Sequence, residues 1–149
     1  MATKWFDMPT IALLSAEVWT RLGEGFDFLG YRFQQTRAKR IRRWAGKKAV
    51  SKLRDRVRPI TRRTNGHSLE SIIDQLNRIL RGWFEYFKQS RASSLQTQDK
   101  WVRNRLRSVL KGRQKRRGIA KGWDNARWPN RYFAKHGLYS LMQAQADAR

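Results

Sequence analysis

The residues that could carry chemistry are few, and their spacing matches no catalytic site. Transfer of a nucleotidyl group needs carboxylates that converge on two metal ions about 4 Å apart, whereas the 11 Asp and Glu residues lie singly along the chain. The closest pairs are Glu24 with Asp27 and Glu70 with Asp74. Both pairs stand among basic residues, where ion pairing is the expected role. We therefore assign no catalytic residue and expect no enzymatic activity.

Metal and cofactor sites are also not indicated. The sequence has no Cys, and neither His67 nor His136 has a partner three or four residues away, as a metal site on a helix requires. Gly23, Gly25 and Gly30 do not have the spacing of a phosphate-binding loop. We expect no metal and no cofactor, with both histidines at helix caps or on the surface.

The charge points to a polyanionic partner. The chain of 149 residues has 34 Lys and Arg against 11 Asp and Glu, a formal charge of +23. This excess destabilises a free folded protein by self-repulsion unless an anion screens it. Arg is about twice as common as Lys, which favours bidentate contacts with phosphate groups. Nucleic acid is the expected partner.

RNA is favoured over DNA because the sequence shows no recognition helix or zinc finger for the major groove. Trp44, Trp123, Trp128 and Tyr132 lie among basic residues, where they can stack on unpaired bases. Packing of the same four rings at the ends of a helical bundle explains them equally well, and both alternatives stay open.

The composition also excludes several classes of protein. With 40% apolar residues, the chain has too much buryable surface for a disordered basic tail. It is too short for a polymerase or a two-domain enzyme. Its longest apolar run, residues 11–14, is far below the roughly 20 residues of a membrane helix. We expect a folded bacterial protein of the cytoplasm that does not bind membranes.

The expected fold is mainly α: a short β-hairpin, then a three-helix bundle, then a basic loop with a short helical tail. Residues 1–24 are treated as a leader without a recognisable motif. Alternating apolar residues over 26–33 predict one strand with a bulge at Gly30. A turn over 34–39 and a basic return strand over 40–44 would complete the hairpin.

Helical spacing begins at Lys47 and continues to about Ile60, with Pro59 expected to kink or shorten this first helix. Ser68 is the expected N-cap of the second helix. Apolar residues on one face make this the core helix: Leu69, Ile72, Ile73, Leu76, Ile79, Leu80, Trp83 and Phe87. Gly82 within it suggests that another backbone packs closely there, because Gly weakens a helix.

A third helix is expected from about Leu95 to Lys111, with Leu106 and Val109 on its buried face. It completes a hairpin and three-helix domain over residues 25–112. Residues 113–149 form a basic loop and a tail in which Pro129 starts a helix and Gly137 ends it.

The candidate RNA contacts are basic residues expected on the exposed faces of the first and third helices and in the loop. They are Arg54, Arg58, Arg62, Lys100, Arg103, Arg107, Lys111, Arg113, Lys115, Arg116, Arg117 and Lys121. Those of the third helix recur every three or four residues opposite Leu106, and the loop extends the same strip. One RNA backbone can run along both.

Three blocks of the sequence carry a resemblance to a known family. Residues 25–33 read Gly-Phe-Asp-Phe-Leu-Gly-Tyr-Arg-Phe and resemble the last block of the reverse transcriptases encoded by group II introns. Residues 47–87, ending in Leu-Arg-Gly-Trp-Phe-Glu-Tyr-Phe, resemble the C-terminal thumb and maturase-specific domain (domain X) of these proteins. Residues 128–142, which begin Trp-Pro-Asn-Arg-Tyr-Phe, are similar to the segment that follows.

The resemblance implies an RNA-binding maturase module that helps a structured intron RNA fold into its splicing-active form. The fingers and palm of the polymerase, with the paired catalytic aspartates, have no counterpart here, so the resemblance does not imply polymerisation. Two alternatives stay open: a thumb-like subunit that completes a separately encoded palm in trans, and a truncated relic without function. A ribonucleoprotein component unrelated to introns is disfavoured by the order of the three blocks.

Overall fold

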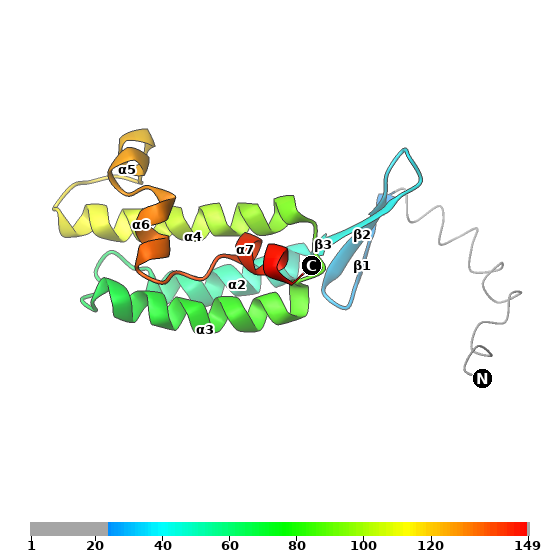
Figure 1. Cartoon of the computed structure of the whole chain (residues 1–149), viewed down its shortest axis with the longest axis horizontal. Coiled ribbons are helices and arrows are strands. Elements are labelled where there is room, and N and C mark those ends of the chain that lie inside the picture. Colours follow the sequence, from blue (N-terminus) through cyan, green and yellow to red (C-terminus); the bar gives the residue numbers. More distant parts are fainter. Residues whose placement is uncertain (1–23, 149) are drawn as a thin grey trace, which may run out of the picture.

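The structure is a computed structural model that describes residues 24–148 (Figure 1). A small antiparallel sheet leads into three long helices, and three short helices follow. The strands are β1 (Phe26–Phe28), β2 (Tyr31–Gln35) and β3 (Ile41–Ala45). The helices are α2 (Lys47–Ile60), α3 (Leu69–Phe87), α4 (Ala92–Arg113), α5 (Gly122–Arg127), α6 (Asn130–Lys135) and α7 (Leu141–Asp147). The mainly α fold is confirmed, whereas the leader lies, apart from Glu24, outside the described residues.

The single strand expected over residues 26–33 is wrong. Leu29 and Gly30 form a tight turn between β1 and β2, both with positive φ, 47° and 79°. Positive φ at both central residues is typical of the two-residue turns that join antiparallel strands. Gly30 therefore serves the turn rather than a bulge. The expected return strand is confirmed as β3, which pairs with β2 in the order β1-β2-β3.

The helix boundaries follow local signals. Pro59 stands in the last turn of α2, which ends one residue later at Ile60. The hydroxyl of Ser68 accepts a hydrogen bond from the Ser71 N–H at 3.1 Å, which confirms Ser68 as the N-cap of α3. This bond satisfies one of the backbone donors that every helix leaves unpaired in its first turn.

The core lies between α3, α2 and α4, and the apolar stripe of α3 faces it. Phe84, not expected in this stripe, is buried, and its ring meets Tyr139 edge to face at 6.0 Å. Ile79 and Trp83, expected in the stripe, are only partly buried. The buried face of α3 is therefore turned toward the C-terminal segment, which covers it.

The C-terminal segment shares this core. Phe133 of α6 and Leu141 of α7 are fully buried against the helices. The Asp99 carboxylate of α4 holds the start of α7, because it accepts hydrogen bonds from the Leu141 N–H at 3.0 Å and the Met142 N–H at 3.1 Å. The segment after the basic loop is thus fixed against α4.

Candidate nucleic-acid interface

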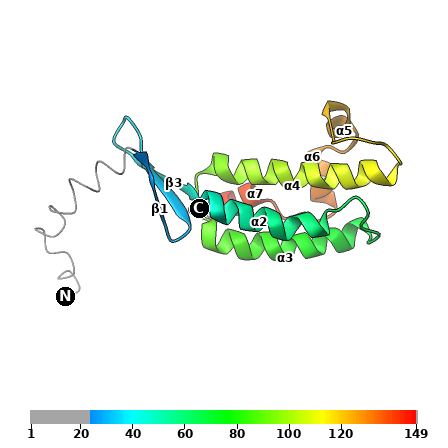
Figure 2. The same cartoon turned by 180° about the vertical axis from the view of Figure 1, so that it is seen from behind.

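Basic residues from two parts of the chain meet at the end of the bundle opposite the sheet (Figure 1, and from behind in Figure 2). The end of α2 and the end of α4 with its following loop form this surface. The Arg63 guanidinium donates to the Gly118 carbonyl at 2.5 Å, and Arg113 donates to the His67 carbonyl. We call this surface the basic end. Its exposed members are Arg58, Arg62, Arg63, Arg113, Lys115, Arg116, Arg117 and Lys121.

Arg105, which sequence reasoning did not single out, joins α4 to the end of α2. Its guanidinium donates from Nε to the Thr61 hydroxyl and from Nη2 to the Thr61 carbonyl, both at 3.0 Å. Burial, and then the positive charges of Arg58 and Arg63, lower the pKa of Arg105 from its ordinary value. Like charges are thus held close together here, and an anion binding beside them would relieve their repulsion.

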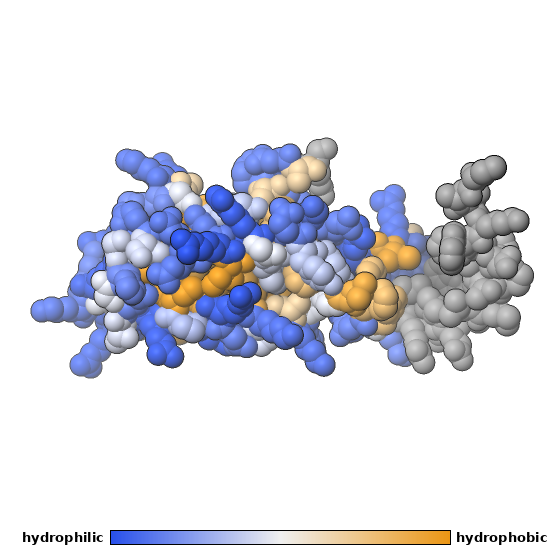
Figure 3. Space-filling view, turned by 90° about the horizontal axis from the view of Figure 1, so that it is seen from below, coloured by the Kyte–Doolittle hydropathy of each residue, from blue (hydrophilic) through white to orange (hydrophobic). Residues whose placement is uncertain are grey.

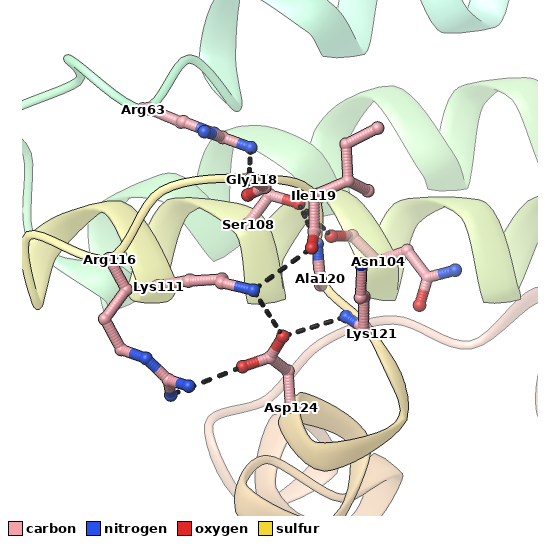
Figure 4. Close-up of polar contacts among 10 residues, drawn as sticks. All are labelled: Arg63, Asn104, Ser108, Lys111, Arg116, Gly118, Ile119, Ala120, Lys121 and Asp124. Carbon is pink, nitrogen blue, oxygen red and sulfur yellow. Dashed lines mark hydrogen bonds and ion pairs between the residues drawn. The ribbon is translucent and has the colours of Figure 1, made fainter.

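The loop between α4 and α5 is held by an ion pair that the sequence analysis did not foresee (Figure 4). Nζ of Lys111 lies 3.0 Å from Oδ2 of Asp124 and 3.2 Å from the Ile119 carbonyl oxygen. Lys111 was expected on the exposed face, but it is 7% exposed and Asp124 is 1% exposed. A buried ammonium needs a counter-ion, and Asp124 is that counter-ion. Lys111 therefore holds the loop in place.

The expectation that Arg107 lies on the exposed face of the third helix is also wrong, because Arg107 is only 4% exposed. Its guanidinium donates to the Trp128 carbonyl and to Oδ1 of Asn130, each at 2.8 Å, and it lies 5.3 Å from the centre of the Phe133 ring. Burial, followed by the charge of Arg103, lowers the pKa of Arg107. The face of α4 expected to meet solvent is covered by the segment after the loop, so Arg107 fixes that segment.

The other candidate residues lie outside the basic end. Arg54 is half-buried, donates to Oε1 of Gln98 at 3.3 Å and stacks over the Trp101 ring. Lys100 and Arg103 line a groove of about 440 Å³ between α4 and the segment that leads into α6. The structure thus divides the candidates into an exposed group at the basic end, a pair in this groove, the half-buried Arg54, and the buried Arg107 and Lys111.

The four aromatic candidates also divide, and Trp44 of β3 is half-buried. Trp123 on α5 is 86% exposed, next to Lys121 of the basic end. Trp128 is buried, and Tyr132 is partly buried with its ring against Phe133. Of the two readings left open by the sequence, stacking on a base suits Trp123, whereas packing accounts for Trp128 and Tyr132.

The histidines are peripheral in the structure. His136 caps the end of α6, and its Nδ1 lies 3.3 Å from a Glu70 carboxylate oxygen, whereas His67 is exposed. Within residues 24–148, no three His, Cys, Asp or Glu side chains are grouped to hold a metal ion. None of the helices described combines the length and the apolar character that crossing a membrane requires.

The Asp124 ion pair predicts a dependence of stability on pH. The Lys121 backbone N–H and then the Lys111 ammonium donate hydrogen bonds to this carboxylate, and together they lower its pKa below the ordinary 3.8. A group with a depressed folded pKa stabilises the protein above its unfolded pKa, and this contribution is lost as pH falls through the folded value. Asp124→Asn should therefore lower the melting temperature at pH 7, and the difference from the parent should shrink below about pH 4. A difference that stayed constant down to pH 2.5 would contradict the depressed pKa.

The comparison with known families bears on the same residues. The family model described as the group II intron, maturase-specific domain matches residues 50–133, more than half of the chain. The chain belongs to this family. The resemblance found in the sequence is thereby confirmed, and the match contains all of α3, α4 and the basic loop. No curated protein shows a significant match to the chain. The matched region therefore includes all the residues of the basic end and the ion pair between Lys111 and Asp124.

Proposed function

We propose that this maturase-family protein binds structured RNA of a group II intron through its basic end and helps that RNA to fold for splicing. The observation that carries the proposal is the meeting of exposed cations from α2 and from the α4–α5 loop on one surface. Exposed Lys and Arg bind phosphate groups and release the counterions condensed on the RNA. Guanidinium groups add bidentate contacts, which an ammonium group does not make.

Two kinds of basic residue have different roles in this proposal. The exposed residues of the basic end contact phosphate groups directly. Lys111 and Arg107 are buried and do not contact RNA themselves. They hold the loop and the following segment against α4 and so position the exposed residues. A surface held by such buried contacts meets RNA with less loss of conformational freedom than a flexible loop does.

We infer that the chain supplies RNA binding and no nucleotidyl transfer. Three carboxylates within residues 24–148 are engaged in contacts that hold the fold. Asp124 pairs with Lys111, Asp99 caps α7 and Asp55 lies 2.5 Å from the Arg58 guanidinium. Transfer chemistry on the two-metal pattern needs carboxylates that converge on the ions, and these three lie in separate structural contacts.

A second candidate function is favoured by one feature of the sheet. Phe28 and Leu29, at the turn between β1 and β2, are both more than half exposed. Exposed apolar groups at one tip are typical of a surface that another protein covers. A separately encoded polymerase palm that seats this turn would make the chain a thumb-like subunit in trans.

The experiment that tests the proposed function compares two RNAs of equal length, a group II intron RNA and an unrelated structured RNA, in filter-binding titrations between 50 and 300 mM KCl. We expect tighter binding of the intron RNA at every salt concentration. The non-specific phosphate contribution falls with salt for both RNAs, so specific contacts survive as a persistent difference. Equal affinities for the two RNAs across the series would reduce the function to non-specific phosphate binding.

A further inference from the structure

A second surface feature lies near the other end of the bundle, between α2 and α3 beside the β1–β2 turn. It is a pocket of about 500 Å³, within the range of small-ligand sites. Its apolar lining comes from the sheet turn and from both helices: Leu29, Ala49, Leu53, Ile79, Trp83, Tyr86 and Phe87. In the space-filling view of Figure 3, apolar surface gathers near the sheet and again over the helices, with hydrophilic residues around it.

Gly82 of α3 borders open space in this pocket. The expectation that another backbone packs against Gly82 is wrong, because a Cβ added there would meet no atom within 4 Å. Gly82 is instead one of the residues that line the pocket. Gly weakens a helix relative to Ala, so neither helix stability nor close packing accounts for it. The structure shows instead that this position borders unfilled space.

The aromatic walls of the pocket are held in place. The Tyr86 hydroxyl donates to the Leu29 carbonyl at 2.8 Å, and the Tyr31 hydroxyl donates to the Tyr86 carbonyl at 2.5 Å. The Trp83 and Phe87 rings pack with centroids 4.7 Å apart. Nε1 of Trp83 is buried and has no hydrogen-bond partner within residues 24–148. The aromatic walls are therefore fixed by contacts within the protein, and the Trp83 N–H is covered by protein atoms.

The charge around the pocket selects the ligand. Lys48, Lys52 and Arg56 line it, and no Asp or Glu does. These three residues are four apart on α2 and therefore follow one another by about 6 Å along the helix. A ligand that combines a flat aromatic body with a chain of negative charges fits both the lining and this row of cations. RNA with an unpaired base is such a ligand.

We propose that this pocket receives one unpaired RNA base, while Lys48, Lys52 and Arg56 bind the phosphates that flank it. The inference rests on the proposed RNA-binding function and adds a preference for a bulged or single-stranded position. The base stacks on an aromatic wall of the pocket. The basic end, at the opposite end of α2, then binds the same RNA through phosphates alone.

The test uses the full chain and two hairpin RNAs that contain 2-aminopurine, a fluorescent base. In one hairpin the 2-aminopurine is bulged, and in the other it is paired with uridine. Stacking of a base on an aromatic side chain corresponds to an affinity gain of about fivefold or more. We expect the parent to bind the bulged hairpin at least fivefold more tightly and to change its fluorescence.

Gly82→Leu fills the pocket, and Gly82→Ala is the matched control that strengthens the helix and leaves most of the space. Gly82→Ala should keep the preference for the bulged hairpin, whereas Gly82→Leu should bind both hairpins with the parent's affinity for the paired one. Melting temperatures at or above the parent's will show that both variants fold. A Gly82→Leu variant that still prefers the bulged hairpin overturns the proposal. The pocket would then be a site for a protein segment rather than for an RNA base. Equal binding of both hairpins by the parent also overturns it, while salt-dependent binding of both would leave the proposed function standing.

Discussion

Replacement of Arg107 by alanine is expected to destabilise the protein by about 2 to 4 kcal/mol. The change leaves the buried Trp128 carbonyl without its donor and removes the bond to Asn130. It also removes the guanidinium from the Phe133 ring. Each lost contact lies between α4 and the segment that carries α6. Urea unfolding followed by far-ultraviolet circular dichroism measures the effect.

Arg103 provides the matched control, because it lies about one turn earlier on α4 and is only partly buried in the groove beside α6. Arg103→Ala removes the same charge and should change the free energy of unfolding by no more than about 0.5 kcal/mol. If the two variants were equally stable, the Arg107 side chain would be in solvent. It would then return to the group of candidate RNA contacts.

The core helix could be predicted because its signals are local. The apolar stripe of α3 repeats over five turns, and Ser68 stands where a capping hydroxyl is needed. Such a stripe indicates a buried face whatever covers it. Which segment packs against α3 depends on distant parts of the sequence. The burial of Phe84 in place of Trp83 therefore could not be predicted from the sequence of α3 alone.

The sequence contains a signal for the turn between β1 and β2, although the alternation of apolar residues over 26–33 resembles one continuous strand. Apolar residues fall on even numbers at Phe26 and Phe28, then on odd numbers at Tyr31 and Phe33. Side chains of one strand alternate with a period of two, so this change of parity marks a break between residues 28 and 31. A two-residue turn accounts for the break, and Gly30 with its positive φ sits within it.

The buried cations show where spacing along a helix stops being informative. A row of Lys and Arg reads as a solvated face, yet α4 is covered on that side by residues 119–133. One signal for Lys111 was present, because Asp124 is the single acidic residue between Lys100 and Ala146. An isolated carboxylate in a basic stretch is a candidate partner for a buried ammonium. No comparable signal marks Arg107, whose partners are a carbonyl and an amide.

The largest effect on RNA binding is expected from removing three exposed cations of the basic end together. The triple variant Arg62→Gln, Lys115→Asn and Arg117→Gln changes residues that are all exposed. Asn suits position 115, whose φ is 57°, in the left-handed region that Asn tolerates. The affinity for intron RNA should fall by at least about tenfold near physiological salt, with the melting temperature unchanged.

The salt dependence of this affinity tests the central claim most directly, because the slope of log K against log salt counts the phosphate contacts. It should become shallower by about 0.7 to 0.9 for each contact removed, or roughly 2 to 3 for the triple variant. The matched control replaces three exposed arginines at the sheet end of the molecule with glutamine: Arg37 and Arg40 in the turn between β2 and β3, and Arg42 in β3. We predict a clearly smaller change in slope for this control. Equal changes in the two variants, or an unchanged slope in the basic-end variant, would contradict RNA binding at the basic end.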